Sequence, residues 1–113
     1  MKKNTITIEV ELDKDQMPEN IKWTAEGSNM DKPAIAKAMF LSFFDRDYKD
    51  TYRLDLWAKD MQVPEMDMFV YHSINGLADV YFRATNNNKC ASAIKQLAQY
   101  LAEENNLFEK GEG

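Results

Sequence analysis

The stretch from Tyr52 to Met66 reads Y-R-L-D-L-W-A-K-D-M-Q-V-P-E-M and divides the 113-residue chain into two parts of different periodicity. Apolar and polar residues alternate from Tyr52 to Trp57, which predicts a half-buried strand. A short loop follows, and Pro64-Glu65 is typical of the first turn of a helix. The chain is therefore expected to form mainly sheet before this stretch and helix after it.

Two strands are predicted near the N-terminus. Thr5 to Leu12 alternates strictly between polar and apolar residues, and Ile21 to Ala25 alternates again. The segment between them, residues 13–20, is polar and contains Pro18, so it is expected to be a loop. The two strands are therefore predicted to pair antiparallel.

The apolar segment from Ala34 to Phe44 is ambiguous, because a short apolar run fits either a helix or a strand. A polar, turn-like stretch follows at residues 45–50, and then comes the strand Tyr52–Trp57 at matching length. This layout is typical of a hairpin. We therefore favour a strand over about residues 37–45.

Helical periodicity begins at Pro64. Apolar residues then recur at three- and four-residue steps, as Met66, Val70, Ile74, Leu77, Ala78, Tyr81 and Ala84. A second helix, about Lys89 to Glu104, carries an apolar face made of Cys90, Ile94, Leu97, Ala98 and Leu101. Both segments are expected to be helical.

These elements predict an α+β fold, in which a four-stranded antiparallel sheet is followed by two C-terminal helices packed on one of its faces. Residues 1–107 are expected to form a single domain, since domains commonly hold roughly 100–150 residues. Residues 108–113 are expected to form a flexible tail.

Composition restricts the functions open to the chain. The 14 Lys and Arg residues are scattered among 19 Asp and Glu residues, and the net charge of −5 opposes nucleic-acid binding. No apolar run reaches the ~18–20 residues of a membrane-spanning helix, and no signal peptide is recognisable. A single cysteine, Cys90, fits a reducing compartment. A cytoplasmic location is the expectation.

The residues that often carry chemistry do not form a catalytic pattern. His72 is the only histidine, and Cys90 falls on a predicted apolar helix face, where a cysteine packs as a small hydrophobe. Asp13-Lys14-Asp15 and Asp45-Arg46-Asp47 resemble the start of a calcium loop, but both lack its Gly and its final Glu. We expect no enzymatic activity, no metal and no cofactor.

The hairpin register predicts an interaction surface. If Phe44 pairs with Thr51, Phe40 lies opposite Asp55, while Tyr52, Leu54 and Leu56 pack inward with Phe43, Leu41 and Met39. A register shifted by one residue would exchange the two sets of side chains of the second strand. One face of the hairpin then carries Phe40, Phe44, Arg53, Asp55 and Trp57. An exposed aromatic patch indicates contact with a second copy or another protein, and closure of the patch by flanking loops is the alternative.

The order and spacing of several motifs resemble the gliding motility protein GldC family. They are I-T-I-E-V-E-L-D from Ile6, P-E-N-I-K-W-T-A from Pro18, A-K-A-M-F-L-S-F-F-D from Ala36, L-D-L-W-A-K-D-M-Q-V-P-E-M from Leu54 and L-A-D-V-Y-F-R-A-T from Leu77. The fourth is the most specific. Pro64 departs from it, because an acidic residue is expected there in relatives.

The resemblance implies a non-enzymatic accessory or adaptor protein of gliding motility, the surface locomotion coupled to type IX secretion. Its implied partners are proteins of that machinery, with the chain in the cytoplasm or at the inner face of the cytoplasmic membrane. It supplies no catalytic residue and no cofactor. The alternative is a holdase chaperone similar to the SecB family, which shares the layout of four antiparallel strands followed by two helices.

Overall fold

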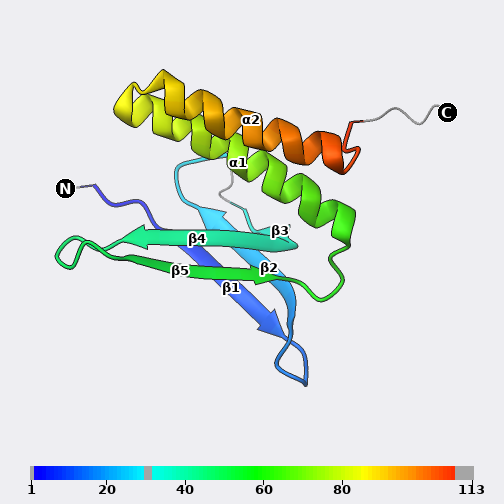
Figure 1. Cartoon of the computed structure of the whole chain (residues 1–113). Helices are drawn as coiled ribbons and strands as arrows, with labels where there is room; N and C mark the ends of the chain where they lie inside the picture. Colours follow the sequence, from blue (N-terminus) through cyan, green and yellow to red (C-terminus); the bar gives the residue numbers. More distant parts are fainter. Residues whose placement is uncertain (1, 30–31, 109–113) are drawn as a thin grey trace. The chain divides into compact units, whose positions relative to one another are not determined.

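A computed structural model describes residues 2–29 and 32–108. The order of elements is β1 (Ile6–Leu12), β2 (Pro18–Ala25), β3 (Ala34–Ala36), β4 (Ala38–Phe44), β5 (Thr51–Trp57), α1 (Val63–Thr85) and α2 (Asn88–Glu104) (Figure 1). The chain forms two compact units, which meet in sequence between Met61 and Gln62. The predicted single domain over residues 1–107 stays a prediction, and the predicted tail at 108–113 lies, apart from Phe108, outside the described residues.

The first three strands form an antiparallel sheet in the order β1-β2-β3. The predicted pairing of the two N-terminal strands is confirmed, and Val10 lies opposite Ile21. β2 begins at Pro18, three residues before the predicted start at Ile21. Lys22 forms an ion pair of 3.0 Å with Glu11 on the neighbouring strand, and this contact lowers the pKa of Glu11.

The prediction of one four-stranded sheet is wrong, because the described residues form five strands in two sheets. β3 pairs with β2, and β4 pairs with β5 in a separate two-stranded sheet. The break falls at Lys37, whose backbone carbonyl accepts a hydrogen bond of 2.6 Å from the N–H of Ala58. This bond continues the β4–β5 register by one pair, whereas Ala36 pairs with Ile21 of β2. The apolar run from Ala34 to Phe44 is therefore divided between two ladders.

The predicted hairpin register is confirmed in full. Ala38 lies opposite Trp57, Phe40 opposite Asp55 and Phe44 opposite Thr51. The ambiguous segment is therefore strand, in two pieces. Asp45 closes the connecting turn, because its side chain accepts hydrogen bonds from the N–H groups of Asp47 and Tyr48.

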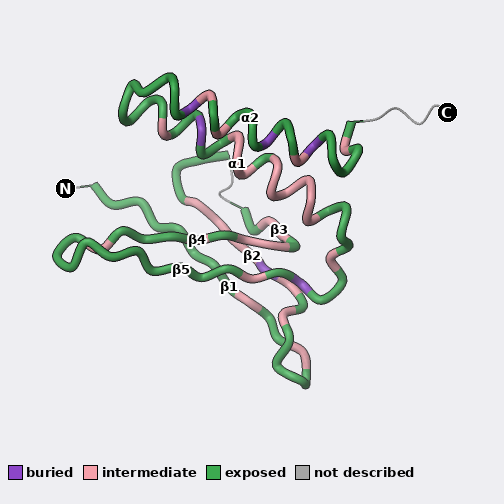
Figure 2. The backbone as a smooth tube through the Cα atoms, in the orientation of Figure 1, coloured by how far each residue is buried: buried purple, intermediate pink, exposed green. Residues whose placement is uncertain are grey.

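The first unit has a small core. Among the described residues, Ile21 on the central strand β2 is the one large side chain that is fully buried, at 1% exposed. A cavity of about 200 Å³ lies beside it between the two sheets and is lined by Ile6, Ile8, Ile21, Trp23, Met39, Phe40 and Leu41. Figure 2 shows that most of β1, β4 and β5 is exposed or half-buried. The unit therefore leaves many apolar side chains open.

An ion-pair cluster links the β1–β2 turn of this unit to the segment after β5. The Nζ of Lys59 lies 2.9 Å from Asp13 Oδ2 and 3.3 Å from Glu19 Oε2, and the backbone N–H of Lys59 donates to the carbonyl of Pro18. The hydrogen bond from Lys59, followed by the one from the N–H of Met17, lowers the pKa of Asp13 to about 2. Asp13 in turn raises the pKa of Lys59.

Asp13→Asn is expected to reduce stability in a pH-dependent way. Asn keeps an oxygen for the N–H groups of Asp15 and Met17 but loses the negative charge beside Lys59. Because folding lowers the pKa of Asp13 from its ordinary 3.8 to about 2, its contribution is complete above the ordinary value and disappears as the pH falls through the lower one.

The melting temperature of Asp13→Asn should therefore approach that of the wild type as the pH falls between those two pKa values. Thermal unfolding of both proteins at pH values above, between and below them measures this. Lys59→Met removes the same ion pair from its other side and should show the same trend. A difference that stays constant over the whole range would contradict the assignment.

The second unit is a helical hairpin whose helix limits agree with the prediction to within one residue at the start of each helix. Glu65 accepts a hydrogen bond of 2.8 Å from the N–H of Gln62 at the start of α1, and the side chain of Asn87 accepts one of 3.0 Å from the N–H of Cys90 at the start of α2. Asn86 ends α1 in a left-handed conformation, at φ 60°.

The buried stripe of the hairpin is made of small residues. Ala91, Ala98 and Ala102 of α2 and Ala78 of α1 are buried, and Lys95 on the same side of α2 forms an ion pair of 3.1 Å with Asp79. The predicted apolar face of α2 is therefore wrong for Cys90 and Leu97, which are exposed. Alanine side chains allow the closest approach between helices, which places bulkier neighbours at the margin.

Candidate protein-interaction surface

The predicted interaction residues lie on one face of the β4–β5 hairpin. Because successive strand side chains point to opposite faces, the pairs Phe40–Asp55, Ser42–Arg53 and Phe44–Thr51 share a face with Ala38–Trp57. We call the surface formed by Phe40, Phe44, Arg53, Asp55 and Trp57 the aromatic face. The structure thus places all five predicted residues together.

The centre of the aromatic face is polar. Arg53 donates hydrogen bonds of 3.1 Å from Nε and Nη2 to the two carboxylate oxygens of Asp55. Its Nη1 donates a further bond of 3.1 Å to the hydroxyl of Ser42 on β4. The guanidinium is therefore held flat across both strands, with its orientation set in advance of any binding event.

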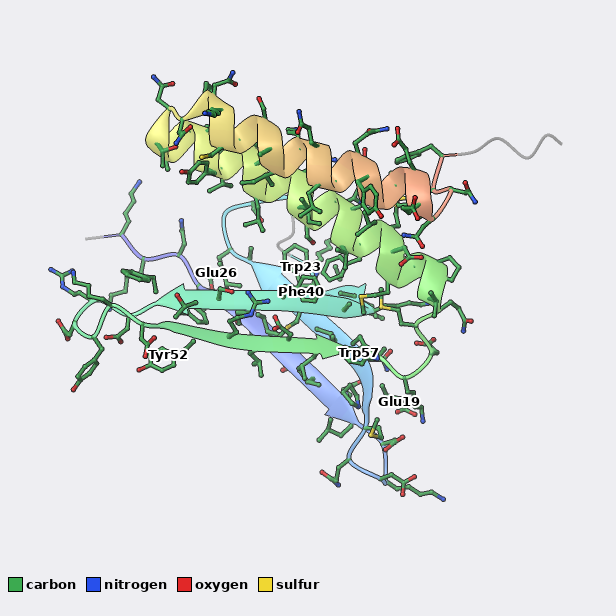
Figure 3. All side chains as sticks on the ribbon, viewed as in Figure 1. Glu19, Trp23, Glu26, Phe40, Tyr52 and Trp57 are labelled. Carbon is green, nitrogen blue, oxygen red and sulfur yellow. The ribbon has the colours of Figure 1, made fainter. Side chains whose placement is uncertain are left out.

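Aromatic side chains lie on both sides of this centre. Phe44 is 68% exposed and Trp57 is 56% exposed, whereas Phe40 is 39% exposed and also lines the cavity between the sheets. Figure 3 shows Trp57 and Tyr52 at opposite ends of β5. Phe44 and Trp57 are therefore the accessible anchors, and Phe40 is shared between the surface and the core of the unit.

The opposite face of the hairpin is apolar along its whole length. It carries the pairs Met39–Leu56, Leu41–Leu54 and Phe43–Tyr52. The expectation that this face is core holds only in part, because Met39, Leu41 and Leu56 are half-buried while Phe43, Tyr52 and Leu54 are exposed. Alternation in the sequence identifies which residues share a face, but it does not reveal how much of that face is covered.

The remaining candidate residues do not come together. The Asp79–Lys95 ion pair sets the register of the helical hairpin, so Cys90 lies beside the end of α1, roughly 12 residues or ~18 Å along the helix from His72. Asp13 and Asp45 use their carboxylates to hold their own turns. Within the described part of the chain, no group of three or more His, Cys, Asp or Glu side chains is placed to hold a metal ion.

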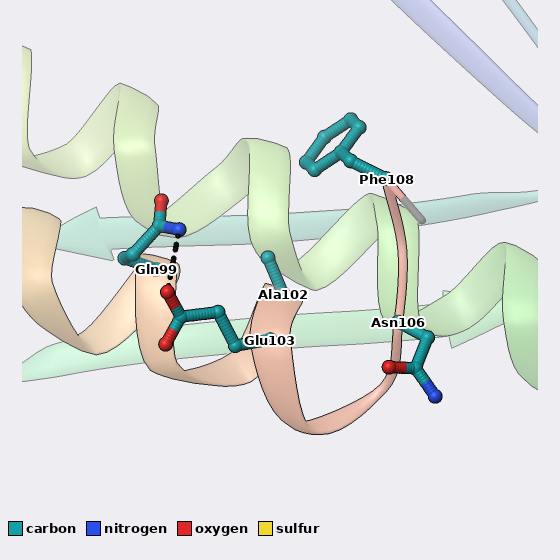
Figure 4. Close-up of a pocket in the computed structure, with 5 residues that line it drawn as sticks. All are labelled: Gln99, Ala102, Glu103, Asn106 and Phe108. Atoms are coloured by element: carbon teal, nitrogen blue, oxygen red, sulfur yellow. Dashed lines mark hydrogen bonds between the residues drawn. The ribbon is translucent and has the colours of Figure 1, made fainter. Parts of the chain in front are cut away.

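The second unit has a surface depression of about 380 Å³ at the C-terminal end of α2. Gln99, Ala102, Glu103, Asn106 and Phe108 line it, and Gln99 donates a hydrogen bond of 3.1 Å to Glu103 (Figure 4). Phe108 packs edge-on against Tyr71 of α1, with ring centroids 5.0 Å apart. The depression is a gap at the helix end and holds one carboxylate, already bound within its own helix.

None of the helices in residues 2–29 and 32–108 is both long enough and apolar enough to cross a lipid bilayer.

The observations define a small α+β protein in which strands precede a helical hairpin and an aromatic sheet face is open to solvent. The chain belongs to the GldC-like family, since the family model described as gliding motility-associated protein GldC-like matches residues 18–107. This match confirms the resemblance inferred from the motifs and associates the chain with gliding motility. Comparisons with curated proteins and with solved structures give no match.

Proposed function

We propose that the chain is a non-enzymatic accessory protein of gliding motility that acts by binding other proteins through its aromatic face. The observation that carries this proposal is the exposure of Phe44 and Trp57 on either side of a preoriented Arg53, in a member of the GldC-like family. Tryptophan and arginine dominate the binding energy of protein interfaces, where they are enriched among the residues that matter most.

The proposed partners are proteins of the gliding machinery, including the type IX secretion apparatus coupled to it. The proposed location is the cytoplasm, at the inner face of the cytoplasmic membrane where such a partner is anchored. The net charge of −5 favours a partner with a basic surface, because opposite potentials speed encounter.

Trp57→Ala is expected to weaken the partner interaction roughly 30-fold or more, since truncating an aromatic anchor at an interface commonly costs about 2 kcal/mol or more. Cross-linking and pull-down of the tagged chain from a gliding bacterium, compared between wild type and variant, measures the loss. Tyr100→Ala is the matched control, because Tyr100 is an exposed aromatic residue on α2, which belongs to the other compact unit.

Recovery of motility or secretion components that falls in Trp57→Ala and persists in Tyr100→Ala supports the proposal. Two outcomes contradict it: no such component recovered with the wild type, or the same recovery with both variants.

The second candidate function is a holdase chaperone similar to the SecB family. The observation in its favour is the apolar face formed by Phe43, Tyr52 and Leu54, which are exposed behind the aromatic face. A holdase suppresses the aggregation of an unfolded client without any motility component. Purified chain that leaves client aggregation unchanged would discard this candidate and leave the first one standing.

A further inference from the structure

The outer edge of β5 is an unprotected strand edge. Within residues 2–29 and 32–108, β5 pairs with β4 alone, so the backbone groups along its other side lie outside any ladder. Its seven residues run in regular register, without a bulge and without Pro or Gly. Proteins normally protect such an edge with a bulge, a proline, a lysine or a short strand, because an open edge pairs with other chains.

The outer edges of β1 and β3 are protected. β1 has a register irregularity between Glu11 and Leu12 and carries the acidic residues Glu9 and Glu11. β3 has three residues. β4 has no charged residue, so its edge offers no charge complementarity to a second copy. β5 is therefore more open to an added strand than β1 or β3 is.

The sequence of β5 is complementary to itself when two copies run antiparallel. T-Y-R-L-D-L-W has Leu54 at its centre, so a twofold axis there pairs Leu54 with Leu54 of the second copy. Arg53 then lies opposite the second copy's Asp55, and Asp55 opposite the second copy's Arg53. Arg53 also forms an ion pair with Asp55 of its own strand. Each of the four charged side chains, two from each copy, therefore has oppositely charged neighbours both along its own strand and across the axis.

The apolar residues of the strand match in the same register. Tyr52 lies opposite Leu56 of the second copy, on the same face as the two paired Leu54 side chains. In the single chain Leu54 is 50% exposed, so this pairing would cover it. An equivalent pairing of β1 about Glu9 would place Glu9 against its own copy, with like charges directly opposite. Charge complementarity therefore favours pairing at β5 over pairing at β1. It also favours β5 of a second copy of this chain as the strand that pairs with this edge.

We infer that the chain forms a twofold-symmetric dimer in which β5 pairs antiparallel with β5 of a second copy, centred on Leu54. The two hairpins join into one four-stranded sheet, which is more stable than an isolated two-stranded ribbon. The twofold axis uses the β5 edge of both chains, so this contact closes at two chains. The aromatic face occurs twice on this sheet, so the dimer presents two copies of it to a partner.

Sedimentation equilibrium of the purified full chain tests the dimer. We expect a concentration-dependent mass that rises to twice the 13.1 kDa of one chain. Arg53→Asp makes all four central charges negative and Asp55→Arg makes them positive, so each variant should dimerise about 10- to 100-fold more weakly than the wild type. Both residues are on the surface, and circular dichroism checks that each variant is folded.

Two further samples separate charge complementarity from simple damage. An equimolar mixture of Arg53→Asp and Asp55→Arg restores opposite charges across the axis and should form a heterodimer. The double variant Arg53→Asp/Asp55→Arg should recover homodimerisation. Glu9→Arg is the control, because it changes the charge of β1 by the same amount as Asp55→Arg changes that of β5, and should leave the mass unchanged.

The inference is overturned by a monomer at every concentration up to the solubility limit, by a dimer that resists both charge reversals, or by single variants that the mixture fails to rescue. It does not rest on the proposed function, since the measurement uses purified chain with no motility component. A chain that dimerises but recovers no partner contradicts the proposed function alone. A chain that recovers a partner but stays a monomer contradicts the dimer alone.

Discussion

Ile21→Ala is expected to lower the free energy of unfolding of the first unit by about 2–5 kcal/mol. Ile21 is 1% exposed on the central strand of the β1-β2-β3 sheet. Removing its branched side chain loses the transfer free energy of three carbons and also enlarges the cavity of about 200 Å³ beside it. Because the site already borders a cavity, few neighbouring atoms can move in to fill the space that the truncation leaves.

Denaturant unfolding followed by tryptophan fluorescence measures this loss, because both tryptophans, Trp23 and Trp57, belong to the first unit. Ile35→Ala is the matched control. Ile35 lies on the neighbouring strand β3 and is 68% exposed, so the same truncation should cost about 0.5 kcal/mol or less. Equal losses in the two variants would show that Ile21 is not the centre of this core.

Ala98→Leu is expected to destabilise the helical hairpin by about 1–3 kcal/mol, since added methylenes in a close-packed contact force side chains and backbone apart. Ala98 is 0% exposed and lies in the small-residue stripe with Ala91 and Ala102. Leucine is nearly as good a helix former as alanine, so intrinsic propensity contributes little to the loss. The cost therefore reports the close approach of the two helices.

Thermal unfolding followed by the helical circular dichroism signal measures the effect. Ala93→Leu makes the identical substitution on the same helix at an exposed position and should change stability by no more than about 0.5 kcal/mol. If Ala93→Leu proves as damaging as Ala98→Leu, the stripe is not where the helices meet.

The features that depend on neighbours in sequence were predictable from the chain alone. Alternation between Tyr52 and Trp57, with a polar turn before it, predicts the hairpin, and the assumed pairing of Phe44 with Thr51 is the one that the structure shows. Asn87 and Pro64-Glu65 set the starts of the helices because capping is a local interaction. The order of the motifs likewise identified the GldC-like family. The grouping of the candidate site followed from the hairpin register.

Contacts between segments distant in sequence determine the division into two sheets and the buried face of α2. No local signal separates Ala36 from Ala38, yet Ala34–Ala36 pairs with β2 and Ala38–Phe44 pairs with β5, so the apolar run contributes to two sheets in place of one. In α2, periodicity indicated an apolar face containing Cys90 and Leu97, whereas packing against α1 selected alanines, because helix approach depends on the partner's shape. Periodicity records which side chains share a face. How closely that face is covered depends on backbone positions that only long-range contacts determine.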